Sequence, residues 1–567
     1  MGVLAWITLL PLFGAALVML VPRDEEAIHR GLGMLFAVAT FAISLLILPD
    51  FDASKAGFQL EVDKLWIAPL GIRFHLGIDG ISLWLVLLTT FLMPLTLLSP
   101  QAIGTRNIRV REFTVAMLVL ESGMVGAFLA LDLFVFYVFW ELMLIPMYFI
   151  IGIWGGQRRL YAAVKFVIYT LVGSLLMLVA ILYLYSQWHA ATGGTSFDYT
   201  NLSHLTLPQG PQLACFAAFA LAFAIKVPIF PLHTWLPDAH VEAPTGGSVI
   251  LAGVLLKFGT YGFIRFALPM FPLAAEAAAP LLATLAVIGI IYGALMAYVQ
   301  NDAKKLVAYS SVSHLGFVVL GILTLNPQGV QGALYQMLAH GVSTGGLFLA
   351  VGLLYDRRHT RILSDFGGLW KQTPIFAACF LVIVLASVGL PGLCGFIGEF
   401  LVLIGTFTAN KTWAATGMVG YFPYPKLMGA LSAFAVILAA MYLLTMYQKL
   451  MFGPLDKPEN KTVKDIHGRE TWVFGIVVVA ALVLGLAPQP ILSRSEKSVD
   501  AFITGYRDRL TEARRAPDAP AHVYPALPAA ATGPAAPAAP AAPAPAAAAP
   551  GPAPAPPPAL PPGGVVQ

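Results

Sequence analysis

Charged side chains stand in the middle of long apolar stretches of this sequence. Lys226 lies in FALAFAIKVPIFPL, and Lys257 lies in SVILAGVLLKFGTYGFI. Glu141 is far from both ends of its apolar stretch, and Glu399 follows a segment rich in proline and glycine. A charge at the centre of a bilayer costs several kcal/mol, so such residues are retained for a function. We therefore predict a functional role for all four.

Two histidines stand in the same kind of surroundings. His314 lies in SSVSHLGFVVLGI and His340 in YQMLAHGVSTGGLFLA, in successive apolar stretches. A lone buried histidine is usually structural, but two of them, alongside Lys257 and Glu399, favour a function. Histidine has a pKa of about 6.5, which suits it to passing protons at neutral pH. No histidines are spaced i, i+4 and no His/Cys cluster has metal-ligand spacing, so no metal site is predicted.

A buried lysine beside a movable carboxylate can act as a switch for protons. Burial disfavours the charged form of a lysine, whereas a nearby carboxylate favours it. We expect Lys226 to hold a proton when Glu141 approaches, and to release it toward Lys257 when Glu141 withdraws. The predicted proton relay consists of Glu141, Lys226, Lys257, His314, His340 and Glu399.

Other charges in or near the apolar stretches have alternative explanations. Glu121 stands beside Ser122 and Gly123, where a part in the relay and a local hydrogen bond both remain open. Asp132 falls between two apolar stretches, and we expect it to cap the N-terminus of a helix. Basic side chains near the end of a membrane span can extend to the interface, which we expect of Lys165, Arg265 and Lys449.

These residues need elements that hold them within a membrane. The chain of 567 residues is 58% hydrophobic and only 11% charged, and about 20 apolar residues suffice to cross a bilayer. We count fourteen such stretches and predict an all-α polytopic membrane protein. The stretches lie near 3–21, 30–48, 80–99, 112–131, 133–154, 163–186, 213–232, 246–267, 281–299, 306–323, 331–354, 375–407, 427–449 and 471–489.

Two of the stretches are expected to be broken helices. Pro228 and Pro231 follow Lys226, and Pro391 stands between glycines in the long stretch 375–407. Proline in a helix interior removes a backbone hydrogen bond, and a membrane tolerates irregular backbone only where it is packed in protein or lines a cavity. One broken stretch in each half indicates inverted repeats with sites near the membrane midplane.

Basic residues are distributed unevenly between the loops. With the N-terminus outside, most lysines and arginines fall in cytoplasmic loops, so we predict that both termini lie outside; the basic segment 490–515 runs against this bias. The first stretch lacks a basic leader and a clear cleavage site, and we expect a retained helix there. From about Ala516 the sequence is low-complexity Ala/Pro, for which we predict disorder.

One segment of the chain is similar to a known family. Residues 225–266, IKVPIFPLHTWLPDAHVEAPTGGSVILAGVLLKFGTYGFIRF, closely resemble the antiporter-like subunits of respiratory complex I, which in turn resemble the large subunits of Mrp-type cation/proton antiporters. Three further stretches resemble the M-type branch, called subunit 4 in mitochondria. They are GIDGISLWLVLLTTFLMPL (77–95), YGFIRFALPMFP (261–272) and LPGLCGFIGEFLVL (390–403), and the resemblance covers about residues 1–490.

The resemblance implies a fold of fourteen helices with two inverted five-helix repeats and broken seventh and twelfth helices. It implies that Glu141 is the fifth-helix glutamate, Lys226 the seventh-helix lysine and Lys257 the central lysine. His314 and His340 match the relay region, and Glu399 matches the terminal position, where the other two antiporter-like paralogues carry lysine. For the loop after the first break, lining of the proton uptake route and plain loop hydrogen bonding both remain open for His233, Asp238 and His240.

The implied organisation assigns residues 1–111 to three N-terminal helices and 112–267 and 268–450 to the two repeats. The last helix with its flank follows at 451–515, and the tail at 516–567.

The resemblance also implies partners and a location. It places the chain in the inner membrane of a bacterium, within the lipid bilayer, beside other complex I membrane subunits that include neighbouring antiporter-like subunits. The chain would then be a subunit of the H⁺-translocating NADH:quinone oxidoreductase, driven by quinone reduction elsewhere; nucleic acid is not an expected partner. No G-x-G-x-x-G follows a strand, and Cys215, Cys379 and Cys394 form no C-x-x-C pair. We therefore expect no cofactor in this chain, with FMN, iron–sulfur clusters and quinone in partner subunits.

Three alternatives remain open from the sequence. The chain could be a Mrp-type Na⁺/H⁺ antiporter subunit or the membrane subunit of a related hydrogenase. A structural membrane anchor is the third, and the buried charges argue against it because an anchor gains nothing from their insertion cost.

Overall fold

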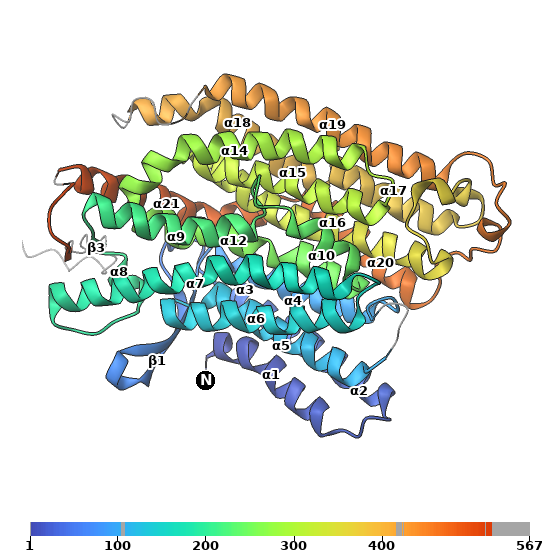
Figure 1. Ribbon diagram of the computed structural model, residues 1–567, viewed down its shortest axis with the longest axis horizontal. Helices are drawn as coiled ribbons and strands as arrows, with labels where there is room; N and C mark the ends of the chain where they lie inside the picture. Colours follow the sequence, from blue (N-terminus) through green and yellow to red (C-terminus); the bar gives the residue numbers. More distant parts are fainter. Residues whose placement is uncertain (1, 104–107, 416–421, 423, 516, 524–567) are drawn as a thin grey trace, which may run out of the picture. The chain divides into compact units, whose positions relative to one another are not determined.

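The computed structural model describes residues 2–103, 108–415, 422, 424–515 and 517–523 as a bundle of roughly aligned helices (Figure 1). Eleven of the described helices are long and apolar enough to cross a membrane, and three shorter apolar helices accompany them. The predicted all-α polytopic fold is confirmed. The count of fourteen helices and the predicted repeat boundaries stay predictions, and the tail from residue 524 onward lies outside the described residues.

The first part of the chain supplies an outer group of helices and a β-hairpin. The hairpin is a feature that the hydropathy pattern did not predict. The elements are α1 (Val3–Leu20), α2 (Glu26–Leu45), α3 (Ile47–Asp50), β1 (Gln59–Ile67), η1 (Ala68–Leu70), β2 (Ile72–Ile78), α4 (Ser82–Leu98), α5 (Val110–Leu129), α6 (Leu133–Trp154) and α7 (Arg159–Thr192).

The middle of the chain contains the first broken helix and an irregular central helix. Its elements are α8 (Tyr199–Leu202), β3 (Leu205–Thr206), α9 (Gln209–Lys226), α10 (Trp235–Glu242), α11 (Thr245–Ile250), η2 (Leu251–Leu255), α12 (Lys257–Gly262), η3 (Phe263–Ala267) and α13 (Leu268–Met270). The segments η2 and η3 are π-helical and flank α12 on both sides.

The last part contains the second broken helix and a long terminal helix. Its elements are α14 (Pro272–Tyr298), α15 (Ala303–Leu323), α16 (Pro327–Arg358), η4 (Leu363–Asp365), η5 (Leu369–Lys371), α17 (Pro374–Val388), α18 (Cys394–Ala415), α19 (Pro425–Met451), η6 (Pro458–Asn460), α20 (Arg469–Leu486), α21 (Gln489–Arg515) and β4 (His522–Val523). β4 pairs with β3 in antiparallel fashion.

Both predicted breaks are confirmed. In the first, α9 ends at Lys226 and the chain returns to helix only at Trp235. In the second, α17 ends at Val388 and α18 begins at Cys394. Between them Gly389 and Gly392 adopt φ of +85° and +91°, which side chains with a Cβ rarely adopt.

The most deeply buried helices lie at the centre of the bundle. The apolar windows of α11–α13 and of α16 are buried along their whole length. A helix that is apolar all round must pack against protein on every side. These two helices carry Lys257 and His340, so the fold places the predicted relay in its interior.

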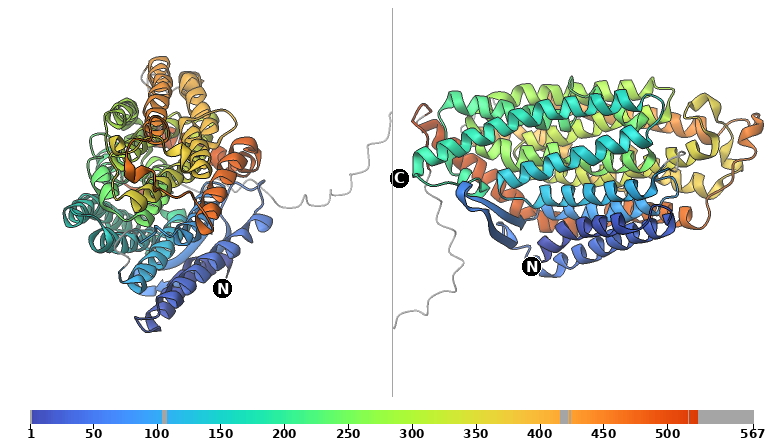
Figure 2. Two further views of the ribbon diagram at one scale, coloured as in Figure 1. Left: turned by 90° about the vertical axis from the view of Figure 1, so that its right-hand side faces the viewer. Right: turned by 60° about the horizontal axis from the view of Figure 1, so that its bottom comes forward.

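One end of the bundle, which we name the hairpin face, carries β1, β2, α8 and α21 (Figures 1 and 2). β1 and β2 form an antiparallel pair, and α21 packs against α13, α14 and α16. Ser498 on α21 accepts a hydrogen bond from Gly80 N at 2.9 Å and donates one to Ala56 O at 3.4 Å. The basic segment that violated the loop bias is thus an amphipathic helix lying across this face.

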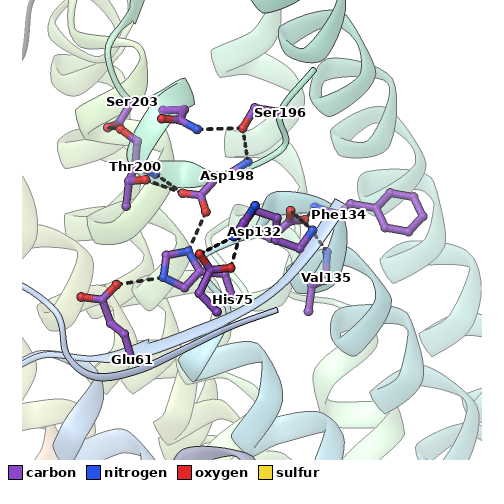
Figure 3. A network of polar contacts seen from close by, with 12 residues as sticks. Glu61, His75, Asp132, Phe134, Val135, Ser196, Asp198, Thr200 and Ser203 are labelled. Carbon is purple, nitrogen blue, oxygen red and sulfur yellow. Dashed lines mark hydrogen bonds and ion pairs between the residues drawn. The ribbon is translucent and has the colours of Figure 1, made fainter. Parts of the chain in front are cut away.

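A polar network anchors the hairpin to the helices (Figure 3). His75 on β2 contacts Asp198 through Nδ1 at 2.6 Å and Glu61 through Nε2 at 2.9 Å. Burial alone lowers the pKa of His75, but the hydrogen bonds to the two carboxylates outweigh it and raise the pKa to about 9.

Asp132 caps α6 as predicted, accepting from Phe134 N and Val135 N; burial raises the pKa of its carboxyl to about 6.

The opposite end, which we name the basic-loop face, holds the loops 155–158, 299–302 and 359–368. Arg361 Nε lies 3.3 Å from Asp302 Oδ2, which joins two of these loops. Gly156 N donates to Glu242 O at 2.9 Å, which joins the third to the end of α10.

Candidate functional site

Lys257 is the fully buried centre of the site. Its Nζ donates to Ala252 O at 2.6 Å, a carbonyl within the π-helical segment η2. A π-turn breaks the regular i→i−4 ladder and leaves carbonyls free for other donors, which is why such turns are frequent at functional sites. The irregular helix therefore supplies the acceptor that a buried ammonium group needs.

The second partner of Lys257 is His340 on α16, whose Nδ1 lies 2.8 Å from Nζ. When Lys257 is protonated, Nδ1 must accept, and the ring hydrogen then resides on Nε2. That Nε2 is buried and has no hydrogen-bond partner among the described residues. The His340 ring thus contacts the Lys257 amine through Nδ1, while its Nε2 has no partner among the described residues.

His314 stands next to His340, with ring centroids 5.9 Å apart and planes tilted by 61°. The described hydrogen bonds do not join the two rings directly. A proton passing between them therefore needs a bridging water or a ring rotation.

Glu399 completes the line at the second break. His314 Nδ1 lies 2.8 Å from Glu399 Oε1, and Gln336 Nε2 donates to the same oxygen at 3.0 Å. The hydroxyl of Tyr442 lies 3.3 Å from His314 Nε2. Burying a carboxylate without hydrogen-bond partners is costly, and the contacts of Glu399 with His314 and Gln336 offset that cost and hold the side chain in place.

Gly389 explains why the break is adjacent to Glu399. Its left-handed backbone ends α17, and an added Cβ would lie 3.1 Å from Glu399 Oε2. The absence of a side chain lets the chain turn beside the carboxylate. The break between α17 and α18 therefore leaves room for the carboxylate of Glu399.

Lys226 and Glu141 lie apart from this line. Lys226 is 1% exposed, and its Nζ lies 5.4 Å from the ring centroids of both Trp140 and Phe166. The described part of the chain contains no ion pair of Lys226 within 4.0 Å, and Glu141 Oε1 is buried without a hydrogen-bond partner. The structure therefore shows no direct ion pair between Glu141 and Lys226, and their pairing stays a prediction.

The segment after the first break contains unusual polar groups, and Asp238 and His240 lie on the short helix α10 rather than in the predicted loop. Asp238 binds Lys165 Nζ at 2.7 Å, so that lysine pairs with a carboxylate rather than simply extending to the interface. His240 is fully buried, stacks on Phe348 at 4.5 Å, and has both ring nitrogens unpartnered within the described residues. His233 Nδ1 is likewise buried without a partner there. Asp238 therefore has a bonding partner, whereas His240 has none among the described residues; a part of the three residues in proton uptake stays a prediction.

Close to His240, a cavity of about 700 Å³ opens on the basic-loop face. Glu242, Lys304 and Arg361 line it. Lys304 Nζ donates to Ala243 O at 2.5 Å, three residues beyond His240. The cavity is therefore lined by the residues that directly follow His240 in the chain, whereas His240 itself is not part of its lining.

Glu121 does not join the line. It is fully buried, and both carboxylate oxygens lack partners among the described residues. Its neighbour Ser122 donates to Thr8 O at 2.5 Å, so the local hydrogen bond is made by the serine and not by Glu121. Its place in the relay stays a prediction.

Several polar residues of the site were not predicted from the sequence. Gln336 precedes His340 by one helical turn, a spacing that places both on one face of a helix and could have been noticed. Tyr442 gave no signal because aromatic residues are common in apolar helices. Arg265 was expected to reach the interface, but it is buried and paired with Asp79 at 2.6 Å. That pairing joins residues that are 186 positions apart.

Two family models match the chain. The model described as "NADH:quinone oxidoreductase/Mrp antiporter, TM" matches residues 130–422. The model described as "NADH-ubiquinone oxidoreductase chain 4, amino terminus" matches residues 9–126. Together they span both breaks and all six residues of the predicted relay.

Individual relatives agree with the family models. The chain is 46% identical to "NADH-quinone oxidoreductase subunit M" of Rhodobacter capsulatus over 89% of this chain and 97% of the relative. Respiratory complex I of Thermus thermophilus contains a chain similar in structure, with TM-score 0.78 and 35% identity over 89% of this chain and 99% of that one. The Mrp complex of a Dietzia species gives TM-score 0.75 at 20% identity over 90% of this chain and 100% of that one, a likeness of fold alone.

Proposed function

Because the chain belongs to the family of antiporter-like membrane subunits known as NADH-quinone oxidoreductase subunit M or chain 4, we propose that it moves protons across the membrane as part of that complex. The observation that carries the proposal is the buried line of Lys257, His340, His314 and Glu399. Its members come from α12, α16, α15 and α18 and meet at 2.8 Å at both ends of the line. Four titratable groups brought together inside apolar helices fit a proton relay.

The contacts suggest the order of transfer. Lys257 gives a proton to His340 Nδ1, and His340 gives one from Nε2 toward His314. His314 then passes a proton to Glu399, whose carboxylate stands at the second break. Each step moves a proton between groups that can both accept and donate, and the chain's own residues supply every group.

Uptake is assigned to the basic-loop face. Protons would enter through the cavity lined by Glu242 and Lys304 and reach the relay through His240, or through Glu141 and Lys226. Approach of Glu141 would hold a proton on Lys226, and its withdrawal would release that proton toward Lys257. The lack of a direct ion pair between Lys226 and Glu141 among the described residues is compatible with the releasing half of this cycle.

In the proposed mechanism, the free energy that drives proton transfer comes from partner subunits. Quinone reduction, with FMN and iron–sulfur clusters, is assigned to partner subunits, and no redox step is assigned here. The positive-inside rule supports placing the basic-loop face in the cytoplasm and both termini outside a bacterial inner membrane.

The alternatives receive less support. The Mrp likeness is at the level of fold, whereas subunit M sequences match along nearly their whole length. A chain of the membrane-bound sulfane sulfur reductase, an archaeal respiratory membrane complex, is 26% identical over 85% of this chain and 76% of that one. A purely structural anchor leaves the buried hydrogen-bonded line without a reason.

Glu399→Gln tests the proposal. The amide keeps the size of the side chain and can still bond to His314 and Gln336, but it cannot take up a proton. We expect a complex that assembles and oxidises NADH but translocates fewer protons per electron, measured by dye quenching in inverted membrane vesicles. Glu496→Gln, on the exposed side of α21, is the control. An unchanged H⁺/e⁻ ratio in Glu399→Gln refutes the relay.

A further inference from the structure

A second cavity lies on the hairpin face. It encloses about 270 Å³ between the hairpin segment, α8, the end of the central helix and α21. Phe502 and Arg509 of α21 line it, and Asp79 and Arg265 line it as well. A water molecule occupies about 30 Å³ in the liquid, so the cavity has room for several.

A buried ion pair borders this cavity. Arg265 Nη2 lies 2.6 Å from Asp79 Oδ2, and both residues are less than one tenth exposed. The other oxygen of Asp79 accepts from Ile81 N at 3.1 Å and Ser82 N at 2.9 Å, at the start of α4. The carboxylate is therefore fixed by α4 and in turn holds the guanidinium.

Tyr261 lies on the relay side of Arg265. Arg265 Nε donates to the hydroxyl of Tyr261 at 3.2 Å, and that hydroxyl donates to Phe128 O at 2.9 Å. Tyr261 follows Lys257 by four residues on α12, which places both on one face of the helix. Arg265 and Tyr261 thus separate the central lysine from the cavity.

We propose that Arg265 and Tyr261 form a proton barrier that closes Lys257 off from the hairpin-face cavity, with Asp79 as the residue that positions Arg265. This inference rests on the proposed function. A pump must not connect its central site to both sides at once. Arg265 lines the cavity and follows Lys257 by eight residues along the same helical run, so a proton path from the cavity to Lys257 along this run would avoid Glu399.

The chemistry of the two side chains suits a barrier. Arginine has five donors, no acceptor, and does not give up its proton in proteins, so a hydrogen-bonded chain ends at it. The Tyr261 hydroxyl is occupied by Arg265 as donor and by the Phe128 carbonyl as acceptor, and a carbonyl has no proton to pass on. A fixed positive charge also repels an incoming proton, as in other selective pores.

Passive proton flux tests the barrier without any pumping. The purified complex is reconstituted in liposomes, a potassium gradient with valinomycin sets the potential, and a pH dye in the lumen reports proton entry without NADH. We expect Arg265→Gln to raise the flux several-fold over the native complex. Arg509→Gln removes a charge from the same cavity away from the barrier, and should leave the flux at the native level.

A double variant shows where the flux runs. Lys257→Met combined with Arg265→Gln should return the flux to the native level, because the leak is expected to pass through Lys257. If unpaired Asp79 prevents folding of Arg265→Gln, the double variant Asp79→Asn/Arg265→Gln removes both charges and carries the same expectation.

Native flux in an assembled Arg265→Gln or Asp79→Asn/Arg265→Gln complex overturns the barrier. A leak that persists after Lys257→Met also overturns it, because the barrier would then not guard the central lysine. Failure of the relay would instead appear as normal pumping in Glu399→Gln, a measurement independent of this leak.

Discussion

At the scale of single residues, each buried charge in the line has a partner of a particular kind. The ammonium of Lys257 faces a carbonyl and an imidazole nitrogen, and the carboxylate of Glu399 faces an imidazole and an amide. Arg265, outside the line, faces a carboxylate. Within the line, Lys257 and Glu399 each face an imidazole that can exchange a proton with them, whereas Arg265 is held in an ion pair with Asp79 and does not give up its proton. The chemistry of the bonding partners therefore distinguishes the residues of the proposed relay from the proposed barrier residue Arg265.

His75 gives a pH-dependent prediction at this scale. Its pKa in the folded protein is about 9, above the unfolded value of about 6.5. The stabilisation is therefore complete below about pH 6.5 and is lost as the pH rises through about 9. We expect the hairpin to be less stable at pH 10 than at pH 6, by at most about 3 kcal/mol.

Thermal unfolding of the purified complex, followed by tryptophan fluorescence at pH 6 and pH 10, measures this loss. Trp66 on β1 reports from the hairpin itself. His75→Gln, which does not titrate, should show a smaller difference between the two pH values. An equal difference in the variant and the native protein excludes His75 as the cause.

At the scale of elements, broken and irregular helices position the relay. The π-segment η2 frees a carbonyl for Lys257, and the break after α17 brings Gly389 beside Glu399. Regular helices would satisfy their own backbone groups and leave the charges without partners. The helices are therefore irregular at the positions where the residues of the proposed relay need hydrogen-bond partners or space.

Gly389→Ala tests the second break. The left-handed backbone costs alanine about 1–2 kcal/mol, and the added methyl group would crowd the carboxylate of Glu399. We expect lower stability together with a lower H⁺/e⁻ ratio. Gly453→Ala is matched, because Gly453 has φ of +90° but no atom within 4 Å of the added Cβ. It should lose similar stability and keep its pumping; an equal pumping loss in both variants shows that Gly389 acts only through stability.

The sequence predicted some elements and missed others for physical reasons. The breaks at Lys226 and Pro391 were visible because proline and glycine act locally on the backbone. The charges were visible against an apolar background. Other features depend on how distant helices pack against one another. These are the pairing of Asp79 with Arg265, the contact between His314 and Glu399, and the π-helical segments. Such contacts join residues that are far apart in the sequence, so local sequence patterns do not predict them.

At the scale of the whole molecule, the two faces have different openings. The cavity of about 700 Å³ on the basic-loop face approaches His240, whereas the cavity of about 270 Å³ on the hairpin face ends at Arg265. Protons are thus expected to enter at one face and to leave only past Glu399. In the proposed mechanism, the direction of proton transfer follows from which of the two cavities leads to the relay.

Lys257 is the residue on which these routes converge. Lys257→Met in the intact complex, compared with Lys449→Met at an exposed membrane-helix position, therefore tests the central claim most directly. The measurement is the number of protons translocated per electron in inverted vesicles during NADH oxidation. We predict a lower ratio for Lys257→Met and a native ratio for Lys449→Met, with both complexes assembled. A native ratio in Lys257→Met would contradict the account.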